Sequence, residues 1–271
     1  MQKFLIFNLF LFLSFFSFIF TKSFCSQPEF LYKAILNDSV EKINKVSEKG
    51  IDLNRPINGY IPLIHAVLLK KNRSVEVLLK NGTNPNILYR DLSILKHAVK
   101  SGNITAAILL VKNGADFSGI MDVGPIHQGH SQNIITFICS KFDPNEQVYE
   151  LLYELVVHGF NLKGNDYFSS IWDYQTVKAP WINFFIELGA DPNQLINMDY
   201  IDKGTSYTPL LYAIQHGNKN EIETLLNAGA NINQKGRPLY NEGIHTPLSY
   251  AIRLNCDSSI IDYLVDRGAI L

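Results

Sequence analysis

Apolar residues recur along this chain at helical spacing, in short paired blocks separated by a glycine. The clearest copy spans residues 208–233. Each of its two blocks places apolar side chains at i, i+3 and i+4, which gives one apolar face to a helix. The first block contains Leu210, Ala213 and Ile214, and the second contains Ile222, Leu225 and Leu226.

Start and stop signals bound both blocks. Thr208 can cap a helix through its hydroxyl, and Pro209 suits the first helical position, where no N–H partner is required. Gly217 ends the first block, and Gly229 supplies a left-handed residue after the second. The pattern predicts two short helices joined by a tight turn, followed by an extended turn over residues 230–233.

The same arrangement recurs seven times when the phase is fixed by the glycine that follows each second block. The repeat domain then covers residues 27–271, with units that end near residues 54, 86, 117, 163, 193, 233 and 271. Units two, three, six and seven keep the pattern best. The fifth is the most degenerate, with Ile171 and Trp172 in its first helix and Pro180 at the start of its second.

These motifs resemble those of the ankyrin repeat. The residues that carry the resemblance are Thr208-Pro209-Leu210, Ala213, Gly217, Leu225-Leu226 and Gly229-Ala230-Asn231. The resemblance implies an all-α solenoid of about seven helix-turn-helix units with short finger turns, stacked in one row. It also implies a scaffold that binds other molecules through its surface.

Residues 1–25 have the layout of a secretory signal peptide. Lys3 precedes an almost unbroken apolar stretch from Phe4 to Phe20, and small residues follow it. Such a helix spans about 25 Å, slightly less than a hydrocarbon core of about 30 Å, which favours cleavage over anchoring. We therefore expect a secreted or periplasmic protein with no membrane span in the mature chain. A membrane tether formed by an uncleaved N-terminal helix is the alternative.

Charge argues against two classes of partner. The whole chain has a net charge of −1, and removal of Lys3 and Lys22 with the leader takes it to −3. Binders of nucleic acid or of anionic membranes usually carry a clustered excess of Lys and Arg. Neither partner is therefore expected.

Cys139 and Cys256 are predicted to be unpaired, buried thiols. They fall three repeats apart in the alignment, which corresponds to some 30 Å at a spacing of about 10 Å per layer. A disulfide needs α-carbons within about 7 Å of each other.

Motifs that would indicate catalysis are not found. His127 and His130, with Asp122 and Asp143 nearby in sequence, could be drawn as a metal cluster, but their spacing fixes no third ligand and a solvated loop is the preferred interpretation. No nucleophile motif, phosphate-binding glycine loop or catalytic carboxylate pair stands in a supporting context. We expect no enzyme activity, no cofactor and no metal, and we interpret His65 and His97 as structural.

The ankyrin resemblance implies that a partner binds the finger tips and the inner face of the first helices. On that basis the candidate partner-binding residues are Tyr60, Leu68, Leu69, Lys100, Tyr207, Gln215, His216, His245 and Arg253. Alanine at Tyr207 and His216 is expected to weaken binding without unfolding the protein.

The leading hypothesis is an exported, monomeric interaction scaffold for an unidentified protein or peptide. The alternative is an inhibitory or protective subunit of a single periplasmic enzyme.

Overall fold

The computed structural model describes residues 29–57, 59–119, 121, 133–162, 179–197, 206–238 and 243–271. Two compact units, Met1–Phe117 and Ser118–Leu271, divide the chain. The predicted signal peptide lies outside the described residues, as do the His127–His130 loop and the first helix predicted around Ile171 and Trp172.

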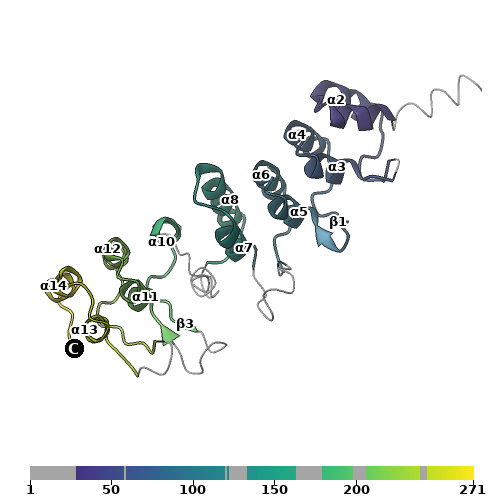
Figure 1. Cartoon of the computed structure of the whole chain (residues 1–271). Coiled ribbons are helices and arrows are strands. Elements are labelled where there is room, and N and C mark those ends of the chain that lie inside the picture. The colour runs from purple at the N-terminus through teal and green to yellow at the C-terminus, as the bar shows by residue number, and fades with distance from the viewer. Residues whose placement is uncertain are drawn as a thin grey trace, which may run out of the picture. The chain divides into compact units, whose positions relative to one another are not determined.

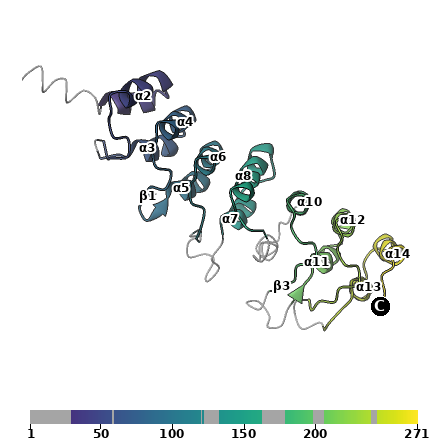
Figure 2. The ribbon, with the colours of Figure 1, turned by 180° about the vertical axis from the view of Figure 1, so that it is seen from behind.

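Helix pairs build the first unit in two layers. One layer contains the helical residues 29–36, α3 and α5, and the other contains α2, α4 and α6 (Figure 1). Contacts join α3 to α5, α2 to α4, and α4 to α6, so each pair packs on the next. The view from behind shows the same two layers (Figure 2). The bounds are α2 Val40–Ser47, α3 Pro62–Leu68, α4 Asn72–Lys80, α5 Ile94–Lys100 and α6 Ile104–Lys112.

Helix pairs recur in the second unit. The fourth repeat has a short first helix, α7, and a longer second helix, α8. Farther along, α11 packs against α12 and α13, α10 against α12, and α13 against α14. The bounds are α7 Ile134–Lys141, α8 Glu146–Val157, α10 Ala179–Glu187, α11 Pro209–Gln215, α12 Lys219–Asn227, α13 Pro247–Arg253 and α14 Ser258–Asp266.

Caps and left-handed glycines set the ends of these helices, as the sequence predicts. The Thr208 hydroxyl accepts a hydrogen bond from the Leu211 N–H at 3.1 Å, and Pro209 occupies the first turn of α11. Every glycine that fixed the repeat phase has a positive φ, for example +91° at Gly229. A side chain at such a position would be strained. The backbone therefore adopts the left-handed conformation at each of these glycines.

Fingers between repeats contain short strand pairs that an all-α description leaves out. Leu88–Tyr89 (β1) pairs antiparallel with Leu92–Ser93 (β2), and Ile196–Asn197 (β3) pairs with Ser206–Tyr207 (β4). Backbone N–H and C=O groups in a finger that leaves the helix layers need partners, and pairing across the finger supplies them.

Asparagine side chains link successive repeats at four of the described turns that follow a second helix. The side chain of Asn86 donates to the carbonyl of Gly114 at 3.1 Å and accepts from the N–H of Asp116 at 2.6 Å. Asn193 does the same with Gly229 and Asn231 in the second unit, at 3.0 and 2.6 Å. Asn54 and Asn233 make equivalent bonds. One residue type, four positions after the glycine, thus connects neighbouring repeats through two backbone groups.

Small residues let the two layers approach closely. The alanine in the middle of the first helix is fully buried in five repeats, at Ala34, Ala66, Ala98, Ala213 and Ala251.

Cys139 and Cys256 are both free and half-buried. Within the ranges that the structure describes, no helix has the length and apolar character needed to cross a bilayer.

Candidate protein-interaction face

Aromatic pairs support the fingers of four repeats. A ring directly before the buried alanine of the first helix packs against a ring from the finger of the same repeat. The ring centroids are 5.2 Å apart for Tyr60 and His65, 5.4 Å for Tyr89 and His97, 6.0 Å for Tyr207 and Tyr212, and 5.5 Å for His245 and Tyr250. Such contacts are favourable beyond the area they bury, so each finger is held against its own helix.

The two histidines of these pairs that directly precede a buried alanine, His65 and His97, differ in their hydrogen bonds. His97 Nε2 lies 2.8 Å from the carbonyl oxygen of Tyr89, which agrees with a structural role. His65 Nε2 is buried and has no hydrogen-bond partner among the described residues. Burial lowers the pKa of His65, so its imidazole is neutral at pH 7. His65 Nε2 is therefore a buried polar atom without a hydrogen-bond partner, in surroundings that are mostly apolar.

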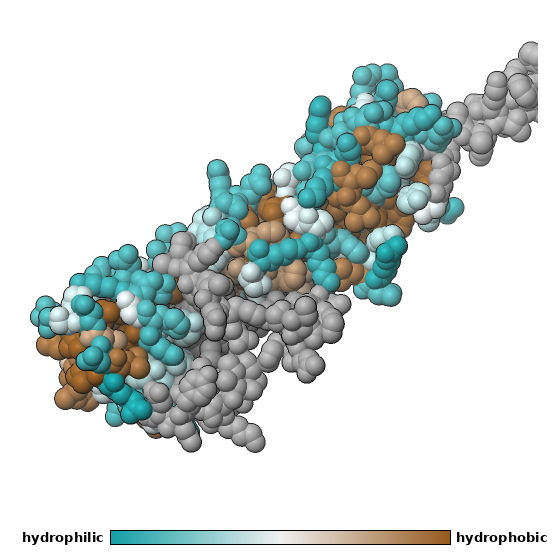
Figure 3. Space-filling view, in the orientation of Figure 1, coloured by the Kyte–Doolittle hydropathy of each residue, from teal (hydrophilic) through white to brown (hydrophobic). Residues whose placement is uncertain are grey.

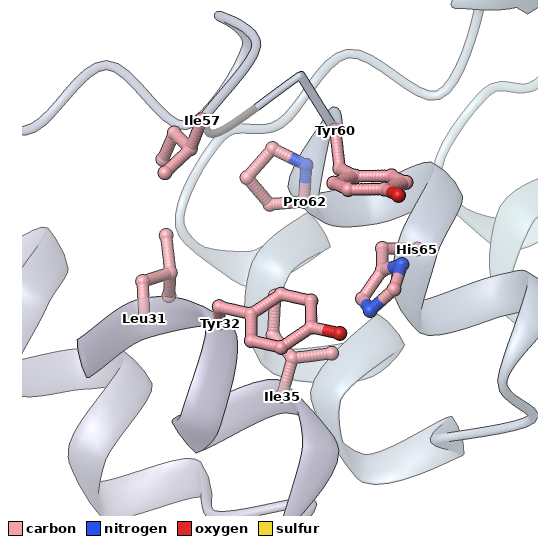
Figure 4. A pocket seen from close by; sticks show the side chains of 7 residues that line it. All are labelled: Leu31, Tyr32, Ile35, Ile57, Tyr60, Pro62 and His65. Atoms are coloured by element: carbon pink, nitrogen blue, oxygen red, sulfur yellow. The ribbon is translucent and has the colours of Figure 1, made fainter. Parts of the chain in front are cut away.

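A small recess lies beside His65, between the first two repeats. The rings of Tyr32, Tyr60 and His65 gather on one side of it, with Leu31 and Ile57 on the other (Figure 4). The Tyr32 ring is 4.9 Å from the His65 ring and 6.4 Å from that of Tyr60. Ile35 and Pro62 complete the lining. The recess is small, so it suits a group no larger than a methyl, next to one hydrogen-bonding atom.

Tyr60 is the one predicted partner-binding residue of the first unit among those that line this recess. Tyr60 is 55% exposed, Leu68 42% and Leu69 39%, while Lys100 is half-buried. Leu68 and Lys100 hold equivalent positions on α3 and α5, which pack together, so they belong to one row. Hydrophobic residues gather on the visible side of the first unit (Figure 3).

The predicted residues of the second unit form a separate, more polar set. Gln215, His216 and Arg253 are exposed, and His245 is half-buried. The His216 ring stacks on Tyr212, with centroids 4.2 Å apart, and its Nδ1 lies 3.0 Å from the Tyr212 carbonyl oxygen.

The ring of Tyr207 does not face a partner as predicted, because its side chain is fully buried. Its hydroxyl donates to the side-chain oxygen of Gln215. The residue before it, Ser206, pairs with the neighbouring finger, because Ser206 and Arg237 exchange backbone hydrogen bonds at 2.7 and 2.9 Å. A Cβ on Gly236 would come within 2.6 Å of the Ser206 carbonyl, so only glycine fits this approach. Tyr207 is a core residue, and its removal would disturb the fold.

Sequence reasoning missed the recess itself. Tyr32 comes from the first repeat, whereas Ile57, Tyr60 and His65 come from the connection and the second repeat. No single repeat contains the site, so alignment of repeats to one another could not reveal it. The one sequence signal for the recess is the aromatic ring directly before the buried alanine. The repeat pattern by itself indicates only a structural role for that ring.

The described residues offer surface chemistry more than reactive groups. No cluster of three or more His, Cys, Asp or Glu that could hold a metal occurs among them. Asp122, His127 and His130 lie outside that part of the chain. Burial raises the pKa of the Cys139 thiol, which keeps it protonated at pH 7 and a poor nucleophile.

Comparison with known proteins identifies similar repeats and folds. A sequence profile of ankyrin repeats, in three copies, matches residues 178–271. No curated protein matches the sequence at a significant level. Among solved structures, the chain is similar to the human ASB11 ankyrin repeat domain, with 20% identity and a TM-score of 0.49 over 89% of this chain and 98% of that one. It is also similar to the ankyrin repeat domain of Bcl-3, with 17% identity and a TM-score of 0.55 over 88% of this chain and 98% of that one.

Proposed function

We propose that this chain, which has an ankyrin-repeat fold and matches ankyrin repeats over residues 178–271, acts by binding a protein or peptide on the face made by its first helices and fingers, since ankyrin repeats are protein–protein interaction scaffolds. The observation that carries the proposal is the exposure of Tyr60, Leu68 and Leu69 on that face of the first unit. Exposed apolar side chains that lie together, rather than singly, are typical of binding surfaces.

The proposal includes export of the protein. Its support is the sequence of the leader, in which Lys3 precedes the apolar stretch from Phe4 to Phe20. The function is therefore exercised in a secreted or periplasmic setting, and it needs no catalytic residue. A scaffold of this kind works by occupying a partner's surface.

Site-specific crosslinking in the native compartment tests the proposal. A photo-reactive amino acid replaces Tyr60 in one variant and Tyr153 in the control, a tyrosine of similar exposure (50%) on α8. We expect discrete crosslinked partners from position 60 and none of the same partners from position 153. Equal products from both positions, or none from position 60, would refute the assigned face. A single enzyme as the only partner would favour an inhibitory or protective subunit over a general scaffold.

A further inference from the structure

Charge is divided unequally between the two units, although the whole chain is nearly neutral. Residues 29–117 contain 13 Lys and Arg and 8 Asp and Glu, a net charge of +5. Ser118–Leu271 contains 9 Lys and Arg and 17 Asp and Glu, a net charge of −8. A charge of one sign on a unit raises the local concentration of partners of the opposite sign. The first unit therefore favours acidic partners, which the charge of the whole chain conceals.

Lysine and apolar side chains share the first-helix face of that unit. Equivalent positions before the small alanine hold Lys33, His65 and His97, and equivalent positions after it hold Leu36, Leu68 and Lys100. The turn after α3 adds exposed Lys70 beside exposed Leu69. Glu29, the acidic residue at the start of this face, pairs with Lys33 at 2.7 Å. Charge and apolar area thus occupy the same surface.

We propose that this face, which we name the basic apolar face (Lys33, Leu36, Tyr60, His65, Leu68, Leu69, Lys70 and Lys100), binds an acidic peptide segment that packs one aliphatic side chain over the recess at Tyr60. The inference rests on the proposed function and names the chemistry of its partner. A terminal methyl group of that side chain meets the mouth of the recess, beside Tyr60 and Ile57, and carboxylates on either side of it meet the lysines.

A nucleic acid fits this face less well. Single strands bind where aromatic ring faces are open for base stacking. Here the rings of Tyr32 and Tyr60 both pack on His65, at 4.9 and 5.2 Å, and the exposed residues next to them are the aliphatic Leu68 and Leu69.

Fluorescence anisotropy with the full chain and synthetic peptides tests the inference. The probe is a labelled peptide with one leucine flanked on both sides by glutamates, and its controls replace the leucine by alanine or the glutamates by lysines. We expect binding of the probe, weakening with added salt, and about tenfold weaker binding by either control peptide. Absence of binding by the probe, or equal binding of all three peptides, would overturn the proposal.

Variants locate the binding site. Tyr60→Ala is expected to weaken binding of the probe about tenfold, and Tyr60→Phe to restore most of it. Lys70→Glu should weaken it about fivefold, whereas Lys49→Glu, the same charge change just after α2 at an exposed lysine, should leave it nearly unchanged. Equal effects of the two lysine variants would show that net charge alone attracts the peptide, and would refute the face.

Two further measurements separate the other occupants and the two proposals. Tighter binding of a labelled single-stranded oligonucleotide than of the probe would replace the peptide by a nucleic acid, and self-association abolished by Lys70→Glu would replace it by a second copy of the chain. Crosslinks from position 60 to a partner without an acidic segment would contradict this inference and leave the proposed function standing. Loss of both the crosslinks and peptide binding would contradict both.

Discussion

Glu221 is a carboxylate that the fold buries almost completely. It is 3% exposed at the start of α12, and its oxygen accepts one hydrogen bond from the Asn218 side chain at 2.7 Å. Burial raises the pKa of Glu221 to about 7, and the bond from Asn218 only partly opposes that rise. The folded protein therefore holds this proton more strongly than the unfolded chain, where the pKa is near 4.5.

Stability should consequently fall as pH rises. Below pH 4.5 the group is protonated in both states, and between about 4.5 and 7 only the unfolded chain loses the proton. The free energy of unfolding should decrease across this range by a few kcal/mol at most, because each tenfold difference in proton affinity corresponds to about 1.4 kcal/mol. Glu221→Gln should remove this decrease and stabilise the protein at pH 8.

Urea unfolding of the natural protein and of Glu221→Gln, each at pH 5 and pH 8, measures this effect. Glu223→Gln, on the same helix, is the control. An unchanged pH dependence in Glu221→Gln would assign the effect to other groups.

Asn86 offers a second prediction at this scale. Its side chain both donates to Gly114 and accepts from Asp116, so alanine removes two bonds between repeats. Because the site is exposed and water can replace part of the loss, we expect Asn86→Ala to cost about 1 kcal/mol. Asn86→Asp keeps the acceptor and should cost less. Chemical denaturation checks both, and Asn220→Ala on the outside of α12 is the neutral control. A smaller effect of Asn86→Ala than of that control would contradict a linking role.

Fingers at equivalent places in two repeats differ in what they support. Tyr60 and Tyr207 both directly precede the first helix of a repeat, yet Tyr60 is 55% exposed and Tyr207 is fully buried. Tyr207 follows Ser206, whose backbone pairs with Arg237 of the next finger, and the Tyr207 hydroxyl donates to Gln215. A finger tyrosine thus belongs to the surface or to the core according to its neighbour.

Thermal melting should separate these two roles. Tyr207→Ala removes a fully buried ring and its bond to Gln215, and is expected to destabilise the protein by about 3 kcal/mol or more. Tyr60→Ala removes a ring that is mostly in solvent and should change stability by less than about 1 kcal/mol. If Tyr60→Ala melted at a lower temperature than Tyr207→Ala, the buried ring of Tyr207 would contribute less to stability than the exposed ring of Tyr60, against this prediction.

Sequence periodicity predicted the molecule's repeats well because each is specified locally. A cap such as Thr208, a proline after it and a glycine with positive φ such as Gly229 all act within one repeat, so their spacing could be seen in the chain. The burial of Tyr207 and the recess at His65 could not be predicted, because both depend on a neighbouring repeat and on the path of its finger. Signals within one repeat determine where its helices begin and end, whereas contacts between repeats determine which side chains are exposed.

Each of the two compact units has its own buried core, which predicts separable unfolding. Both tryptophans, Trp172 and buried Trp181, belong to the second unit, so tryptophan fluorescence reports only on that unit while circular dichroism reports on both. Leu63→Ala, in the first core, should cost about 3 kcal/mol and shift the circular dichroism transition in urea without moving the fluorescence transition.

Leu225→Ala, at an equally buried leucine of the second core, is the matched variant and should shift the fluorescence transition. If Leu63→Ala moves both transitions together, the units unfold as one cooperative block. In that case the energetic coupling along the repeats exceeds what two separate cores supply, and damage to the basic apolar face would spread to the whole chain.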